Sequence, residues 1–171
     1  ESIVKARNSA NSGSSFSSEN IVGSADGTTI LFVESTNDGS SNFFISWLRL
    51  GNEQSRKVEF SRSANSGSTW NTPVNVDGVG NSDENEFRAS PVISANSDRV
   101  LVVWSETNSG SGASEDQDIV YSVSSNDGST WSDFEDISEH YYESDSGLPS
   151  LASSGDYIYL VYTDNGDYDQ E

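Results

Sequence analysis

The sequence predicts an all-β protein built from three copies of one repeating unit. An octapeptide tract, Ser-x-Asn-x-Gly-x-Ser/Thr-Phe/Trp, begins at residues 9, 63 and 124, and its recurrence at this spacing is typical of repeat architectures. No long stretch places apolar residues at helical spacing. Instead, short runs rich in β-branched and aromatic residues alternate with Gly, Asn, Asp and Ser, which is the pattern of strands and turns.

Each tract lies between two kinds of predicted strand. A short apolar alternation precedes it, at residues 3–7, 58–62 and 119–123. A more apolar run follows it further along the chain, at residues 43–47, 101–104 and 158–162. The aromatic residues that end the second kind of run are Trp47, Trp104 and Tyr162, and we expect their side chains to lie in the core.

The tract suits a tight connection between two strands. An Asn side chain hydrogen-bonds its own backbone two residues on and tolerates left-handed dihedral angles. The Gly two positions later adopts a positive φ without a Cβ clash. The closing aromatic ring can cap the apolar interior of its own small sheet. A single such octapeptide would be an ordinary polar hairpin, but three copies in phase with their flanking strands indicate a structural joint.

With these residues the tract resembles the Asp-box, Ser-x-Asp-x-Gly-x-Thr-Trp, of the sialidase-type (BNR) repeat family. All three copies have Asn where that family usually has Asp, and the first copy also has Ser15 and Phe16 in place of Thr-Trp. The resemblance implies a β-propeller of four-stranded antiparallel blades, with the box joining the third and fourth strands far from any catalytic centre. The structural box residues that it assigns are Ser9, Asn11, Gly13, Phe16, Ser63, Asn65, Gly67, Thr69, Trp70, Ser124, Asn126, Gly128, Thr130 and Trp131.

Repeat phase and length predict about three blade equivalents, which is half of a six-bladed ring. We expect one repeat region, 1–171, with units at approximately 2–55, 56–117 and 118–171, and with one blade split between the two ends of the chain. Propellers close with about four to eight blades. Either two copies associate head to tail and close the ring about a two-fold axis, or further sequence of a longer chain supplies the missing blades. Open stacking into filaments is a third alternative.

The excess of acidic residues limits the kinds of partner that the protein can bind. The chain has 28 acidic and 8 basic residues, a net charge of −20. We therefore expect no nucleic-acid partner and no membrane insertion, because nucleic acid needs a basic face and no apolar stretch is long enough to span a bilayer. Such acidity suits high salt, where self-repulsion is screened. Together with the lack of Met, which suggests a processed product, it favours an extracellular or cell-surface protein from a high-salt or marine environment.

The resemblance also raises the question of glycoside hydrolysis. Sialidases hold the substrate carboxylate with three arginines, and they use a Tyr/Glu pair with a further acidic residue. Arg88 lies in a Phe-Arg-Ala-Ser-Pro segment similar to one that carries such an arginine, but the equivalent positions in the other repeats are Ser146 and Leu31. Arg88, Tyr141 and Tyr142 are candidate ligand-binding residues, and no catalytic set can be assembled from one chain.

Calcium is the cofactor that the acidic loops would suit, although the sequence requires none. Calcium takes six to eight oxygen ligands, and residues 164–169 and 115–118 are dense in carboxylates. The candidate ligands are Asp164, Asp167, Asp169, Asp116 and Asp118. No Glu closes an EF-hand loop, so solvated acidic loops are the simpler interpretation.

The function that the sequence favours is a non-catalytic, sialidase-like propeller module. It would bind a glycan or a protein at the cell surface, or serve in structural assembly, since propellers present loops and clefts as ligand surfaces. The alternative is a fragment of a sialidase-like glycoside hydrolase.

Overall fold

The computed structural model describes residues 1–51, 56–78, 88–107, 117–138 and 145–165. Every regular element within these ranges is a β-strand, so the all-β prediction is confirmed. The strands are β1 (Ser2–Ala6), β2 (Asn20–Ala25), β3 (Thr29–Asn37), β4 (Phe43–Leu50), β5 (Arg56–Ser63), β6 (Val74–Asn75), β7 (Arg88–Ala95), β8 (Val100–Thr107), β9 (Gln117–Ser124), β10 (Glu135–Asp136), β11 (Ser146–Ser154) and β12 (Tyr157–Asp164). The described residues contain no helix with the length and apolar character needed to cross a membrane.

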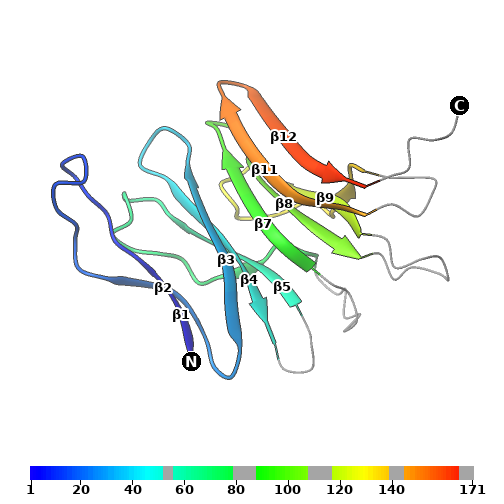
Figure 1. Ribbon diagram of the computed structural model, residues 1–171. Coiled ribbons are helices and arrows are strands. Elements are labelled where there is room, and N and C mark those ends of the chain that lie inside the picture. Colours follow the sequence, from blue (N-terminus) through cyan, green and yellow to red (C-terminus); the bar gives the residue numbers. More distant parts are fainter. Residues whose placement is uncertain (52–55, 79–87, 108–116, 139–144, 166–171) are drawn as a thin grey trace, which may run out of the picture.

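The strands form four antiparallel sheets in which strands that follow one another in the chain pair with one another. Two sheets have four strands, in the orders β3-β4-β5-β6 and β7-β8-β9-β10, and the pairs β1–β2 and β11–β12 form the other two. In Figure 1 the pair β1–β2 (blue) lies at one end of the molecule and β11–β12 (orange and red) at the other. Between them β3 lies beside β7, and β7 beside β11. The described strands do not close into a ring, so the propeller stays a prediction.

The core lies between neighbouring sheets. The larger apolar cluster joins the two four-stranded sheets, and it includes Phe44, Leu48, Val58, Phe60, Val76, Ile93, Val100, Val102, Trp104 and Val120. A smaller cluster, Val4, Val22, Ile45 and Trp47, joins β1–β2 to the sheet β3–β6. Because β4 has a sheet on each side, both of its faces are apolar and buried, as in strands covered on two sides.

Two of the three aromatic residues expected in the core are buried. Trp47 is 1% exposed and Trp104 is fully buried, as predicted. Tyr162, by contrast, is 37% exposed, so its assignment to the core is wrong. The physical reason is that β12 is the edge of a two-stranded sheet, and among the described strands only β11 pairs with it.

The strands β3, β7 and β11 each contain a β-bulge. The pairing register of β3, β7 and β11 shifts between Leu31 and Glu34, between Ala89 and Val92, and between Gly147 and Ser150. Each shift contains a non-glycine residue of positive φ, namely Phe32 (50°), Ser90 (50°) and Leu148 (51°). When the three strands are matched at these residues, the position two residues before the bulge is Arg88 in β7, Ser146 in β11 and Ile30 in β3. The expected equivalent Leu31 is therefore wrong by one residue.

Candidate functional site

The three tracts connect consecutive strands, and we call them box 1 (9–16), box 2 (63–70) and box 3 (124–131). Box 1 lies between β1 and β2, box 2 between β5 and β6, and box 3 between β9 and β10. In each box the residue after the Asn has positive φ, followed by the glycine; in box 3 these are Asp127 (56°) and Gly128 (78°). The left-handed conformation that the sequence suggested for the Asn thus falls on the next residue.

All three boxes share one hydrogen-bond pattern. In box 3 the Ser124 hydroxyl donates to Asn126 Oδ1 at 2.9 Å and accepts from the backbone N–H of Gly128 at 2.8 Å. Asn126 Oδ1 also accepts from the backbone N–H of Thr130, and Asn126 Nδ2 donates to the Thr130 hydroxyl, both at 2.8 Å. Boxes 1 and 2 repeat these contacts at 2.8 to 2.9 Å. An amide therefore holds the turn without adding a carboxylate to an already acidic chain.

Boxes 2 and 3 also attach their own sheets to a neighbouring sheet. The Trp131 ring of box 3 packs edge-on against Phe60 of the adjacent sheet, with ring centroids 4.9 Å apart. Trp70 of box 2 packs against the cluster that includes Val4 and Val22 on β1 and β2. The sequence predicts that the closing aromatic ring covers its own sheet, whereas in boxes 2 and 3 the ring contacts the neighbouring sheet. Phe16 of box 1 differs, because it is 62% exposed.

Polar contacts support the same attachment. In box 2 the backbone oxygens of Ser66 and Gly67 accept hydrogen bonds from Asn8 Nδ2 and Asn20 Nδ2, both at 3.0 Å. In box 3 the backbone oxygen of Asp127 accepts one from Arg62 Nη1 at 3.1 Å. Boxes 2 and 3 are therefore structural joints between neighbouring sheets.

Arg88, expected to bind a ligand, is buried at the contact between the two four-stranded sheets. Its side chain is 2% exposed, and its Nη2 donates to Glu106 Oε1 at 3.0 Å. Its Nη1 donates to the backbone oxygen of Arg56 at 2.9 Å and lies 3.5 Å from Asp77 Oδ2. Burial raises the pKa of Asp77, while the charges of Arg88 and Lys57 oppose that rise. In this position Arg88 serves the packing of the sheets and faces no open site.

Few of the other candidate residues lie in the described part of the chain. Tyr141, Tyr142, Asp116, Asp167 and Asp169 lie outside the described residues. Asp118 lies on β9 and Asp164 at the end of β12, in different sheets. Within the described ranges no three His, Cys, Asp or Glu side chains gather in a group that could hold a metal ion.

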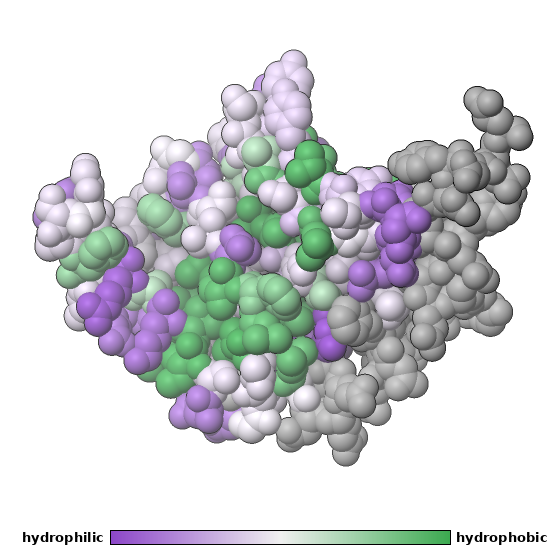
Figure 2. All heavy atoms as spheres, viewed as in Figure 1, coloured by the Kyte–Doolittle hydropathy of each residue, from purple (hydrophilic) through white to green (hydrophobic). Residues whose placement is uncertain are grey.

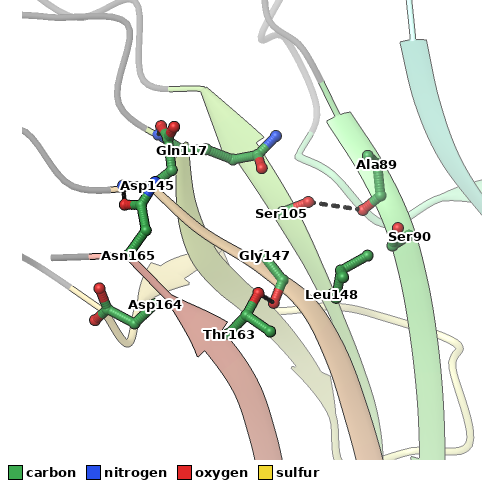
Figure 3. Close-up of a pocket in the computed structure, with 10 residues that line it drawn as sticks. All are labelled: Ala89, Ser90, Ser105, Gln117, Asp145, Gly147, Leu148, Thr163, Asp164 and Asn165. Atoms are coloured by element: carbon green, nitrogen blue, oxygen red, sulfur yellow. Dashed lines mark hydrogen bonds between the residues drawn. The ribbon is translucent and has the colours of Figure 1, made fainter.

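A polar groove lies where the bulges of β7 and β11 meet the ends of β8 and β12. Its volume is about 420 Å³. Its lining residues, shown in Figure 3, are Ala89, Ser90, Ser105, Gln117, Asp145, Gly147, Leu148, Thr163, Asp164 and Asn165. Of this set, only Asp164 is among the site residues that the sequence predicts. The bulges that shape the groove lie at Ser90 and Leu148. Neither residue is a glycine, so the sequence does not indicate the positive φ that both adopt.

Two hydroxyl groups in the groove are held as hydrogen-bond acceptors, because each already donates its proton to a backbone oxygen. The hydroxyl of Ser105 donates to the backbone oxygen of Ala89 at 3.3 Å, and that of Thr163 to the backbone oxygen of Gly147 at 2.9 Å. Both hydroxyls therefore keep lone pairs as acceptors. Asp145 and Asp164 add carboxylate oxygens at the rim. The groove consequently suits a ligand that donates hydrogen bonds.

Comparison with known proteins assigns the chain to no family. No protein-family model matches the sequence, and no curated protein matches it. Function therefore has to be argued from the geometry of the chain itself.

Proposed function

We propose that the protein is a non-catalytic module of the Asp-box propeller type that acts outside the cell and binds a neutral glycan. The observation that carries this proposal is the internal pairing of Arg88. An arginine that clamps a substrate carboxylate needs its donors turned toward the ligand. The Nη2 group of Arg88 instead donates to Glu106. Its Nη1 group donates to the backbone oxygen of Arg56 and lies beside Asp77.

The chemistry of the groove supports a neutral ligand. Sugar hydroxyls donate hydrogen bonds, and the groove offers them the oxygens of Ser105, Thr163 and Asn165. Asp145 and Asp164 would repel an acidic sugar such as a sialoside. The segments that flank the groove residues in the sequence, 108–116, 139–144 and 166–171, contain no Lys or Arg to offset that charge. Leu148, 70% exposed, adds an apolar surface for a sugar ring.

A glycan array read with the whole chain tests the proposal. We expect retention of neutral oligosaccharides, no preference for sialylated ones, and no turnover of a fluorogenic sialoside. Thr163→Val removes a groove hydroxyl while keeping the side-chain shape, so it should weaken binding about five- to tenfold, the worth of one hydrogen bond. Thr29→Val makes the same change on an exposed residue outside the groove and should leave binding unaltered.

Two results would contradict the proposal. Sialoside turnover would favour the alternative, a fragment of a sialidase-like hydrolase. Equal losses of binding in Thr163→Val and Thr29→Val would place the ligand elsewhere on the molecule.

A further inference from the structure

Two sheets of the molecule have only two described strands, so strands that are internal in the four-stranded sheets lie at an edge in them. The sheet β11–β12 ends at β12, and the sheet β1–β2 ends at β1. In the four-stranded sheets the equivalent strands are paired on both sides, β4 between β3 and β5, and β8 between β7 and β9. Open edges present unpaired backbone N–H and C=O groups and favour pairing with a further strand.

The two incomplete sheets are complementary halves of the repeated sheet. Box 1 connects β1 to β2 as boxes 2 and 3 connect the third strand to the fourth. The bulge and positive φ at Leu148 make β11 and β12 equivalent to the first and second strands. Among the described strands, the pair β11–β12 has no third and fourth strand beside it, and the pair β1–β2 has no first and second.

Residues of β12 are exposed where their counterparts are buried. Val161 pairs with the first residue after the bulge of β11. Ser46 on β4 and Val103 on β8 hold the same position opposite the bulges of β3 and β7. Ser46 and Val103 are fully buried, whereas Val161 is 66% exposed. Tyr159, the counterpart of the fully buried Phe44, is 61% exposed. One face of β12 therefore has the composition of a buried face and no described sheet on it.

At the other end of the molecule, β3 has a matching exposed flank. Val33 is 50% exposed, while its counterparts Pro91 and Pro149 are buried. β7 and β11 each have a neighbouring first strand on that side, and β3 has none in the described ranges. Figure 2 shows apolar side chains gathered over this region (green, lower centre). Phe16 is a third such feature, since the ring of its counterpart Trp131 packs on Phe60.

We propose that a second copy of the chain completes both sheets, with β1 of one copy pairing antiparallel to β12 of the other. The repeat fixes the register. Trp47 opposes Glu59 and Trp104 opposes Val120, each four residues before the first Ser of its box. The same register opposes Tyr162, the counterpart of these two Trp residues, to Lys5 of the second copy. This inference goes beyond glycan binding and does not depend on it.

In the completed sheet the exposed features cover one another. The β12 face with Tyr159 and Val161 meets the exposed flank of β3 of the second copy. Phe16 meets the position equivalent to Phe60, which is Tyr121 on β9 of the second copy. Each copy gives one strand pair and receives one, so the contact is repeated about a two-fold axis and closes. Because both copies carry a net charge of −20, association should strengthen as salt screens their repulsion.

Analytical ultracentrifugation of the whole chain over a range of concentration and NaCl tests the stoichiometry. We expect a single species of twice 18.5 kDa, favoured by higher salt. Val161→Arg should raise the dissociation constant about a hundredfold, because it places a charge at a buried contact. Val74→Arg makes the same change on β6, at the outer edge of a complete sheet, and should leave the dimer intact. Both variants should keep the far-ultraviolet spectrum of the parent, since Val161 and Val74 are exposed in one chain.

Engineered disulfides test the register, because the chain has no cysteine of its own. Directly opposed residues of antiparallel strands have Cβ atoms about 4.5–5.5 Å apart, close to disulfide reach. Lys5→Cys combined with Tyr162→Cys should therefore give a covalent dimer on a non-reducing gel. Lys5→Cys combined with Val161→Cys should not, because a shift of one residue moves the side chain to the other face. A persistent 18.5 kDa monomer, a series of ever larger species, or cross-linking of the shifted pair alone would each overturn the proposal.

Discussion

Gly128 in box 3 lies directly against Phe60 on the neighbouring sheet. A Cβ atom on Gly128 would lie 2.2 Å from Cε1 of the Phe60 ring, far inside van der Waals contact. Phe60 has no room to retreat, because it is 2% exposed and packs edge-on against Trp131. The two sheets therefore approach one another at a position where only glycine fits, and this glycine belongs to the box.

The contact between Gly128 and Phe60 predicts a large cost for a single methyl group. Gly128→Ala should lower the free energy of unfolding by about 3 kcal/mol, of which about 1 comes from the positive φ and the rest from overpacking. Gly13→Ala is the matched control, since Gly13 has φ 84° and nothing within 4 Å of its Cβ position. It should cost only about 1 kcal/mol. Urea denaturation of both variants measures the difference, and equal losses would show that the approach to Phe60 imposes no constraint.

The hydrogen bonds of Asn126 predict that a carboxylate can replace the amide but a methyl group cannot. Asn126→Ala removes the acceptor for Ser124 and Thr130 and should cost about 1 to 2 kcal/mol. Asn126→Asp should cost less, because the Thr130 hydroxyl can reverse and donate to the carboxylate. Its residual cost should shrink in high salt, since the new charge adds to a net charge of −20. Thermal denaturation at low and high NaCl measures this, and an Asp variant as unstable as the Ala variant would contradict it.

The second and third strands of the four-stranded sheets were within reach of the sequence, because their signals are local and repeated. The runs at 58–62 and 119–123 lie in β5 and β9, and those at 43–47 and 101–104 lie in β4 and β8. The fourth strands β6 and β10 are two residues long, too short for any periodicity to reveal. Local pattern therefore predicts β4, β5, β8 and β9. It misses the long first strands β3, β7 and β11, whose alternation is interrupted by the bulges, as well as the two-residue strands.

The candidate groove was out of reach for a different reason. Its shape depends on bulges at Ser90 and Leu148, and the third bulge of this kind is at Phe32. A serine, a leucine and a phenylalanine share no preference for positive φ, so pairing with the next strand must impose that conformation. Arg88 was a ligand-binding candidate because its segment is similar to one that carries a substrate-binding arginine, and only the fold shows that Glu106 and Asp77 lie beside it.

The burial of Arg88 predicts a strong and pH-dependent destabilisation when it is removed. Arg88→Met leaves the buried carboxyl groups of Asp77 and Glu106 without their neighbouring positive charge and should cost about 3 to 5 kcal/mol at neutral pH. Burial already raises the pKa of Asp77, and loss of the arginine removes a charge that lowers it. A carboxyl whose pKa is raised in the folded state favours the fold when protonated. The deficit should therefore be full above the folded pKa of Asp77 and shrink as the pH falls through it.

Guanidinium denaturation of Arg88→Met and the parent at pH 7 and pH 5 measures that deficit. The double variant Arg88→Met/Asp77→Asn is the control, because it removes the titrating group. Its deficit relative to Asp77→Asn should change less between the two pH values. A deficit in Arg88→Met that is independent of pH would contradict the assignment to Asp77.

Net charge predicts how the protein responds to ions. With 28 acidic and 8 basic residues, the folded chain repels itself, and NaCl should raise the melting temperature by screening that repulsion. No three carboxylates converge in the described ranges. Because charge screening does not depend on which divalent cation supplies it, CaCl₂ and MgCl₂ at equal ionic strength should raise the melting temperature equally, and a chelator should return it to the value in NaCl alone. Calcium demands more oxygen ligands than magnesium and tolerates irregular loops, so a rise specific to calcium would mean that the loops with Asp116, Asp167 and Asp169 form an ordered site.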